Sequence, residues 1–335
     1  MKNKVIEIGD VKCPPGHIRL GRLNCGYLED SSAVDIPLIV VNGSTDGPVL
    51  WVGSTVHGVE IAGIEVIRRV TREKVDPNDL RGAILAAPIL NPLAYRAHSY
   101  LSPKDGLNMN RVYPGDPDES ITQRMAHAVF SQGISQSDFV VDFHANPAGA
   151  IDYVFVRTGE GEAWRKGFQM AEAYGITIVE SIPRRTGFGS EERLVGLLAD
   201  AAAEHGKPCI TVELTPGYRM EENSIRSGVK GTLNILKFLR MLDGELEPQT
   251  GMRVIKERIG PQIRLTAKRG GLLHYLVPVG SWVVAGQPLL LVRDPWGDVV
   301  ETIASETDGY VLAYSSHGNQ TAASGDIVAF VAPKR

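Results

Sequence analysis

The feature that most constrains the fold is an alternation of apolar, β-rich runs with helix-like segments between Pro37 and Asp243. Short runs such as Val49–Gly53 and Phe139–Phe143 are almost continuously apolar, whereas residues 59–73 carry apolar side chains at helical spacing. Strands without a polar face are typical of a sheet that is covered on both sides. The sequence therefore predicts an α/β domain, and we place it at residues 1–245.

The two ends of the chain differ from this middle part. Residues 1–48 also look β-like, and we expect them to form an edge hairpin on the main sheet. After a linker at Glu245–Pro248, residues 251–335 carry frequent glycines between short alternating runs and no convincing helix. We therefore expect a small, separate all-β domain at 251–335.

Composition excludes several classes of function. The formal net charge is −4, so there is no basic excess to hold a polyanion and a dedicated nucleic-acid binder is excluded. No apolar stretch approaches the ~18–20 residues that span a bilayer, and the first residues lack the apolar core of a signal peptide. Three scattered cysteines indicate neither a disulfide framework nor a thiolate metal site. We expect a cytoplasmic protein without a membrane partner.

A histidine and a glutamate three residues apart follow the run Val49–Gly53. They are His57 and Glu60, in the stretch GSTVHGVE. Residues at i and i+3 share one face of a first helical turn, and Gly58 between them permits a tight bend. One imidazole and one carboxylate are two of the three protein ligands of a catalytic zinc site of the His₂Glu type. Alone, this spacing is a weak signal, because it arises often by chance and is more typical of a polar loop.

A second histidine ends another predicted strand. His144 lies at the carboxyl end of the run Phe139–Phe143. Open α/β sheets place their ligand sites at the carboxyl ends of the strands, so His144 and His57 are expected at the same rim. Asp142 precedes His144 by two residues and shares its strand face. It either orients the imidazole or forms a structural salt bridge.

Two further segments direct polar groups toward that rim. Glu213 ends the predicted strand Cys209–Leu214 and is the best general-base candidate, although a glutamate there is also a common surface residue. The polar segment 91–117 is expected to be a loop over the rim, and it carries Asn110 and Arg111. A planar guanidinium suits a substrate carboxylate, but it can also clamp the loop.

Four segments together resemble the succinylglutamate desuccinylase/aspartoacylase family, which is related to the zinc carboxypeptidases. Their order and approximate spacing match over roughly residues 40–240. The resemblance implies a zinc-carboxypeptidase-like mixed sheet flanked by helices, and residues 251–335 resemble the barrel-type extension of this family. The four segments are DGPVLWVGSTVHGVE (46–60), NPLAYRAHSYLSPKDGLNMNRVYPG (91–115), VDFHAN (141–146) and TVELTPG (211–217).

The resemblance implies a role for each matching residue and one zinc ion per chain. Family members hydrolyse the amide bond of N-acyl amino acids, or closely related amide and ester substrates. The zinc ligands are matched by His57, Glu60 and His144, the glutamate that activates the attacking water by Glu213, and the pair that holds the substrate's carboxylate by Asn110 and Arg111.

The chain departs from the family pattern at one position. Related sequences usually carry an arginine shortly before the SPxDG stretch, thought to polarise the scissile carbonyl, and Tyr100 stands there in this chain. We therefore regard Tyr100 as a substrate-binding candidate. Arg96, four residues earlier, is the catalytic candidate that could reach in instead, unless zinc and a different donor hold the oxyanion.

The repeats of the C-terminal segment resemble a biotinyl/lipoyl-type barrel sandwich. A carrier of that type presents a lysine at the tip of its central hairpin, whereas the corresponding tip here reads Asp294–Asp298 without a lysine. We therefore expect no covalently attached cofactor. The domain is expected to frame the active-site entrance or to form an interface in a possible homo-oligomer.

These observations lead to one main hypothesis and two alternatives. The main hypothesis is a zinc-dependent deacylase that hydrolyses a carbon–nitrogen bond, other than a peptide bond, in a small N-acyl amino acid or related carboxylate-bearing amide. The first alternative is a zinc carboxypeptidase that acts on a peptide C-terminus. The second is a non-catalytic metal-binding protein with a degenerate site.

Overall fold

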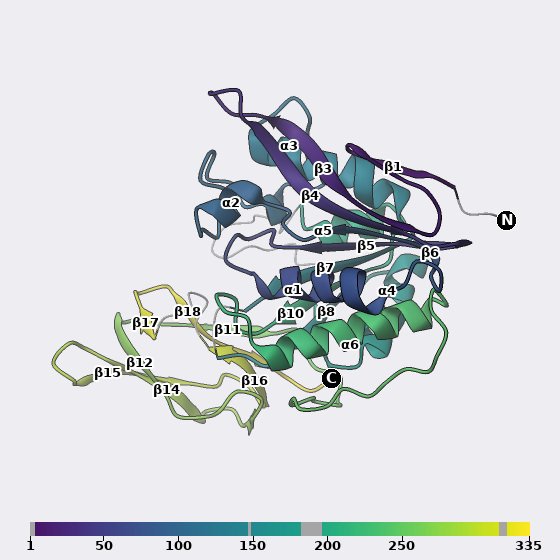
Figure 1. Cartoon of the computed structure of the whole chain (residues 1–335). Helices are drawn as coiled ribbons and strands as arrows, with labels where there is room; N and C mark the ends of the chain where they lie inside the picture. Colours follow the sequence, from purple (N-terminus) through teal and green to yellow (C-terminus); the bar gives the residue numbers. More distant parts are fainter. Residues whose placement is uncertain (1–3, 147–148, 182–195, 315–319) are drawn as a thin grey trace.

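The structure is a computed structural model that describes residues 4–146, 149–181, 196–314 and 320–335 (Figure 1). At its centre lies an eight-stranded mixed sheet. The strand order is β3 (His17–Tyr27), β4 (Ala33–Asn42), β6 (Arg81–Ala87), β5 (Thr45–Ser54), β7 (Phe139–Ala145), β10 (Cys209–Leu214), β8 (Tyr153–Arg157) and β9 (Thr177–Ser181).

The middle of this sheet is parallel and its flanks are not. β6, β5, β7 and β10 run in one direction, so their carboxyl ends meet at one edge. On one flank β4 pairs antiparallel with both β6 and β3, and on the other β8 pairs antiparallel with β10. The two N-terminal strands β1 (Ile6–Ile8) and β2 (Val11–Cys13) form a separate two-stranded sheet. The predicted mixed α/β sheet is confirmed.

Helices cover both faces of the sheet. One core layer gathers residues from α1 (Ala62–Arg69), α4 (Glu162–Tyr174) and α6 (Glu222–Phe238), and the other gathers residues from α3 (Ile121–Ala128) and α5 (Leu198–Glu204). Strand β5 shows why its run is apolar throughout, because Leu50 and Val52 belong to the first layer and Trp51 to the second. Each such buried side chain contributes about 1.5–3 kcal/mol to folding. Short helical turns complete the set: α2 (Pro92–Arg96), Val70–Lys74, Met109–Arg111, Val129–Gly133 and Ile134–Gln136.

Residues after the linker form two antiparallel four-stranded sheets, here called the C-terminal β region (residues 263–332). Its core includes Leu265, Val283, Leu290 and Val328, each buried. One sheet has the order β11 (Ile263–Thr266), β18 (Ile327–Ala332), β16 (Gly309–Tyr314), β13 (Trp282–Val283), and the other β15 (Val299–Ala304), β14 (Pro288–Arg293), β12 (Gly271–Tyr275), β17 (Thr321–Ala322). The all-β architecture expected after the linker is confirmed.

The turn between β14 and β15 contains Asp294–Asp298, the segment at the position where a carrier domain presents its lysine. Trp296 at this turn is 86% exposed, and the turn residues 294–298 include no lysine. The hairpin projects away from the main sheet (Figure 1).

The C-terminal β region packs against the last two strands of the main sheet. Backbone bridges join Ala150 to Ala313 and Val179 to Ile259. Glu180, which is fully buried, pairs with Arg258 at 2.7 Å. The region is therefore attached to the segment between β7 and β8, and the residues just before it, Arg258 and Ile259, are attached to the outer strand β9.

Two helices differ from their expected lengths. The helix expected at Glu191–His205 appears as α5, which begins at Leu198, and residues 182–195 lie outside the described part of the chain. The helical segment expected over 59–73 begins only at Ala62, because residues 57–60 form a turn that presents polar side chains. Among the described residues, no helix combines the length and the apolar character that crossing a membrane requires.

Candidate metal and active site

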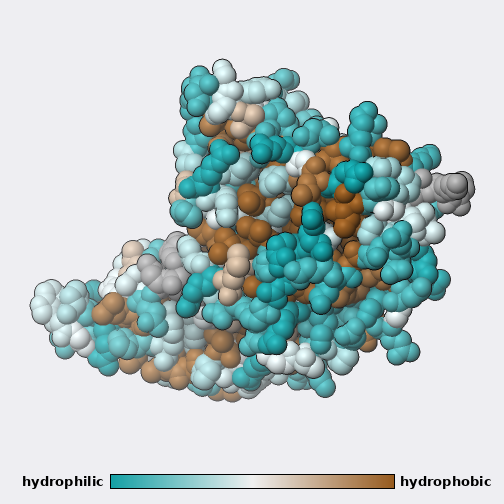
Figure 2. All heavy atoms as spheres, in the orientation of Figure 1, coloured by the Kyte–Doolittle hydropathy of each residue, from teal (hydrophilic) through white to brown (hydrophobic). Residues whose placement is uncertain are grey.

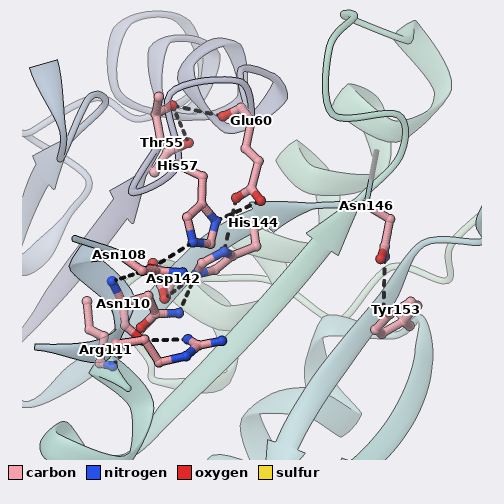
Figure 3. Close-up of polar contacts among 12 residues, drawn as sticks. Thr55, His57, Glu60, Asn108, Asn110, Arg111, Asp142, His144, Asn146 and Tyr153 are labelled. Atoms are coloured by element: carbon pink, nitrogen blue, oxygen red, sulfur yellow. Dashed lines mark hydrogen bonds and ion pairs between the residues drawn. The ribbon is translucent and has the colours of Figure 1, made fainter. Parts of the chain in front are cut away.

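The neighbouring strands β5, β7 and β10 bring polar side chains to one edge of the sheet, and Figure 3 shows those of His57, Glu60 and His144. His57 and Glu60 follow the end of β5, and His144 lies near the end of β7, which pairs with β5 in parallel. On the other side of β7, Glu213 of β10 lies directly opposite His144 in the register. The common rim expected from the strand ends is therefore present.

The turn after β5 is compact because the backbone of α2 packs against it. The amide of Gly58 donates to the carbonyl of Ser99 at 2.9 Å. A Cβ atom at Gly58 would lie 2.1 Å from the carbonyl carbon of Ala94, so only glycine fits between His57 and Glu60. Thr55 supports the same turn, because its hydroxyl donates to the carbonyl oxygen of Glu60 at 2.9 Å.

His57, Glu60 and His144 converge on one point. Their nearest potential ligand atoms all lie within 4.8 Å of one another, and all three residues are buried. Nδ1 of His57 lies 2.8 Å from Oε1 of Glu60, and Nδ1 of His144 lies 3.0 Å from Oε2 of the same carboxylate. Within the part of the chain that the structure describes, this is the group whose side chains could hold a metal ion.

The outward nitrogens of the two imidazoles are both held by oxygen atoms. Nε2 of His57 lies 3.1 Å from Oδ1 of Asn108, and Nε2 of His144 lies 2.9 Å from Oδ2 of Asp142. An amide oxygen and a carboxylate only accept hydrogen bonds, so each Nε2 carries a hydrogen. The neutral form of each ring then presents the lone pair of Nδ1 toward Glu60, which is the arrangement that a metal ligand needs.

The protonation equilibria of the cluster reflect its buried charges. Burial would raise the pKa of Glu60, but His57 and His144 lower it to about 2, so the carboxylate is charged. Burial would lower the pKa of His144, yet the carboxylates of Asp142 and Glu60 raise it well above its ordinary value. The negative charge of these carboxylates thus favours a cation at their centre, either a proton or a metal ion.

One atom of the cluster indicates that a bound cation fits there. Oε2 of Glu60 is buried and accepts no hydrogen bond from a described residue, although it lies 3.0 Å from Nδ1 of His144. Leaving a buried carboxylate oxygen without a donor is costly, and a cation relieves that cost. Two imidazoles and one carboxylate are also a common donor set for a divalent metal with an open coordination position.

Glu213 lies beside the cluster without being part of it. Burial raises the pKa of Glu213 to about 8; His144 opposes this shift, and the carboxylates of Glu60 and Asp142 add to it. A carboxyl group in this setting exchanges a proton near neutral pH, which is the property of a general acid–base group. Its partner on the other side of β10 is Tyr153 of β8, in the antiparallel register.

The loop that carries Asn110 and Arg111 reaches the cluster. Nδ2 of Asn110 lies 3.3 Å from Nε2 of His144, and Oδ1 of Asn110 accepts from the amide of Leu198 at 2.9 Å. The Arg111 guanidinium donates to the carbonyl of Asn110 at 2.6 Å and forms no ion pair with a described residue. Burial lowers the pKa of Arg111 and Tyr100 opposes this shift, while no described carboxylate pairs with the guanidinium, so its charge is available to an anion.

Tyr100 and Arg96 occupy different surroundings. The ring of Tyr100 stacks on the ring of His57, with centroids 3.7 Å apart and an interplanar angle of 15°. The pKa of Tyr100 is raised, first by burial and then by the charges of Glu60 and Glu213, so its hydroxyl is a neutral donor. Arg96 lies exposed in the last turn of α2, and no contact joins it to the described site residues.

Sequence reasoning missed the part played by Asn108. Its side-chain oxygen meets His57 and also accepts from the backbone amide of Asn110 at 2.9 Å. Asn108 lies within the stretch DGLNMNR, two residues before Asn110, so the motif itself contained the signal. Its role became visible only when the loop was placed over the strand ends.

The molecular surface is hollowed between the part of the molecule that carries α2 and the C-terminal β region (Figure 2). Figure 1 places the carboxyl ends of β5 and β7 on the same side of the molecule as α2. The candidate site thus lies at the sheet edge that both parts flank.

Comparison with known proteins was consistent with this geometry. Residues 46–239 match the family of the succinylglutamate desuccinylase/aspartoacylase catalytic domain. The N-alpha-acetyl-L-2,4-diaminobutyric acid deacetylase of Halomonas elongata is 26% identical over 286 residues, which are 84% of this chain and 81% of that protein.

Solved structures show the same fold over the whole chain. The product-bound ectoine utilization protein of Ruegeria pomeroyi superposes with a TM-score of 0.85 at 24% identity, with 100% of both chains covered. A succinylglutamate desuccinylase/aspartoacylase from Rhodobacter sphaeroides gives a TM-score of 0.84 at 23% identity, covering 99% of this chain and 98% of that one. The matched segment contains His57, Glu60, His144 and Glu213, and the chain belongs to the succinylglutamate desuccinylase/aspartoacylase family, whose members include deacylases.

Proposed function

We propose that this protein is a zinc-dependent hydrolase that cleaves the amide bond of a small N-acyl amino acid or a related carboxylate-bearing amide. The observation that carries the proposal is the convergence of His57, Glu60 and His144 within 4.8 Å, beside Glu213 on the next strand. Two histidines and one glutamate are the ligands of catalytic zinc sites that keep one position open. A zinc ion in this place would polarise an acyl carbonyl and lower the pKa of a water molecule toward ~7.

Glu213 is the general base in this proposal. It accepts a proton from the attacking water and returns the proton to the nitrogen that leaves. Its half-buried position and its pKa of about 8 support both steps, because the carboxyl group can hold a proton near neutral pH and release it again. Its place beside His144 in the register keeps the carboxyl group next to the ligand cluster.

Arg111 and Asn110 bind the substrate's carboxylate. The guanidinium of Arg111 has no described ion-pair partner, and a planar fork pairs with a carboxylate through two parallel hydrogen bonds. Asn110 is held by the amide of Leu198, so its side chain is fixed next to His144. Fixing the remote carboxylate aligns the scissile amide, which converts binding energy into rate.

Tyr100 supplies a hydrogen bond to the carbonyl oxygen of the scissile amide. Its neutral hydroxyl is close to the charges of Glu60 and Glu213, and its ring is fixed on His57. Arg96 is the less suitable candidate because its side chain touches none of these groups among the described residues. A phenol donates one hydrogen bond without adding charge, in contrast to an arginine.

The substrate class is supported by the Halomonas elongata relative, which is named as a deacetylase of an N-acetylated amino acid. We propose that this chain also acts on a small N-acyl amino acid. A zinc carboxypeptidase would instead require a cleft that admits a peptide chain. The two activities can therefore be separated by comparing N-acyl amino acids with dipeptides as substrates.

The test is a hydrolysis screen with zinc-loaded protein on acetylated and succinylated amino acids, with dipeptides in parallel. We expect turnover of at least one N-acyl amino acid and none of the dipeptides. Glu213→Gln should lower kcat about 10²–10⁴-fold and retain the metal, because only the proton acceptor is lost. Glu204→Gln, an exposed glutamate on α5, is the control. Cleavage of dipeptides alone, or near-normal rates in E213Q, would show the proposal to be wrong.

A further inference from the structure

The segments that follow the three site strands are joined to one another by backbone hydrogen bonds. The amide of Gly217, after β10, donates to the carbonyl of Asn146, after β7, at 2.6 Å. The amide of Ile61, next to Glu60, donates to the carbonyl of Gly217 at 3.3 Å. The positions of the candidate ligands and of Glu213 are therefore coupled through this rim.

Asp152 forms a hydrogen bond with the backbone just after the end of β10. Its Oδ1 accepts from the backbone amide of Thr215 at 3.0 Å and from the hydroxyl of Ser224 at 2.9 Å. The same hydroxyl lies 2.6 Å from the carbonyl oxygen of Thr215. Asp152 thus holds the backbone amide of Thr215, two residues after Glu213, and the single hydroxyl hydrogen of Ser224 is shared between Asp152 and the carbonyl oxygen of Thr215.

Asp152 is in turn fixed by the C-terminal β region. The amide of Ile151 donates to the carbonyl of Leu312, and the amide of Tyr314 donates to the carbonyl of Gly149, each at 3.1 Å. Strand β16 therefore pairs with the segment that leads directly into Asp152. Beyond Asp152, the hydroxyl of Tyr153 accepts from the side-chain amide of Asn146 at 2.9 Å, which returns to the loop after His144 (Figure 3).

Burying the carboxyl group of Asp152 costs folding free energy. Its side chain is 6% exposed and forms no ion pair with a described residue. Burial raises the pKa of Asp152 to about 6, against the hydrogen bonds from Ser224 and Thr215. A buried carboxyl group that accepts a hydrogen bond from the residue directly after β10 indicates that the end of this strand must be held in a precise position.

We propose that Asp152, with Ser224, is a positioning residue that sets the place of Glu213, and that the C-terminal β region holds Asp152 for this purpose. The inference rests on the proposed role of Glu213 as the general base. It gives the C-terminal β region a part in catalysis although none of its residues needs to touch the substrate. A displacement of about 1 Å in a catalytic group can lower a rate about 10²-fold.

The test compares variants of the full-length, zinc-loaded protein on the N-acyl amino acid that it hydrolyses. We expect Asp152→Ala to lower kcat about 10–100-fold and to change KM less than about threefold, with the metal content unchanged. Asp152→Asn keeps an acceptor oxygen and should restore kcat to within about threefold of wild type. Ser224→Ala, which removes one hydroxyl, should lower kcat about three- to tenfold and keeps the test decisive if D152A does not fold.

Asn234→Ala is the matched structural control. Asn234 is also buried, and its side chain makes two hydrogen bonds to the backbone of Glu247, far from the site. N234A should lose thermal stability and keep its kcat, whereas D152A should lose both. If D152A and S224A keep wild-type kcat while E213Q is inactive, only the positioning role is overturned. If E213Q itself keeps its rate, the proposed function is wrong and the positioning role falls with it.

Discussion

Oδ2 of Asp142 lies 2.9 Å from Nε2 of His144, so one face of strand β7 carries both a candidate metal ligand and the group that orients it. The two residues are separated by one position along the strand and therefore point to the same face. The contact fixes the imidazole with Nδ1 toward Glu60. The local strand geometry, rather than a loop, thus sets the direction from which His144 faces the cluster.

The first prediction concerns this pair. Asp142→Asn keeps the shape of the side chain and removes its charge, so His144 loses a strong acceptor. We expect the affinity for zinc to fall about 10–100-fold, because the partners of metal-bound histidines contribute that much. Competition with a chelator of known affinity measures the change. Unchanged affinity in D142N would mean that Asp142 serves only the packing of β7.

A second prediction separates the two candidates for the donor to the scissile carbonyl. Tyr100→Phe keeps the ring on His57 and removes the hydroxyl, so we expect kcat to fall about tenfold or more with little change in KM. Steady-state kinetics of Y100F and Arg96→Ala on the same substrate provide the comparison. A larger loss of kcat in R96A than in Y100F would assign the role to Arg96 instead.

Recognition of the substrate's carboxylate gives a third prediction. Arg111→Ala should raise KM about 10–100-fold, and Arg111→Lys should recover only part of this loss because an ammonium lacks the planar fork. The informative control is a substrate whose carboxylate is replaced by a carboxamide. On that neutral substrate, R111A and wild type should be equally poor, and a persistent difference between them would place Arg111 elsewhere in the mechanism.

The fourth prediction is a pH dependence of stability. The pKa of Asp152 rises from an ordinary value of 3.8 to about 6 in the folded protein. The folded state therefore favours the neutral form. The contribution of neutral Asp152 to the free energy of unfolding is fully present below about pH 4 and is lost as the pH rises through about 6. Asp152→Asn stays neutral, so its gain in stability relative to wild type should grow from about 1 kcal/mol near pH 4.5 to about 3 kcal/mol above about pH 7.

Urea unfolding of D152N and wild type at several pH values measures this gain. Asp46→Asn is the control, because Asp46 lies at an exposed position near the start of β5 and loses little contact with water on folding. Parallel stability curves for D152N and wild type would contradict the raised pKa of Asp152.

Much of the rim could be predicted from the sequence because its residues lie at the ends of apolar runs. His144 and Glu213 each end a run that is too apolar for anything but a buried strand, and parallel strands end at the same edge. His57 and Glu60 follow the third such run. The convergence of these side chains therefore followed from element order, without knowledge of long-range contacts.

The supporting contacts could not be predicted in the same way. Asp152 meets Thr215 and Ser224 across more than 60 residues of sequence, and the segment before it pairs with a strand that begins at Gly309. Such pairings depend on the order β7-β10-β8, in which β8 turns antiparallel beside β10. No local pattern encodes that reversal. The stacking of Tyr100 on His57 likewise depends on how the loop after α2 folds back.

The central claim is that His57, Glu60 and His144 hold one divalent metal ion per chain. Its most direct test is the metal content of purified, zinc-loaded and dialysed protein, measured by elemental analysis for wild type and His144→Ala. The account predicts about one zinc ion per wild-type chain and a loss of about nine-tenths of it in the folded variant. Equal zinc in both proteins, or a wild-type chain that retains none, would contradict it.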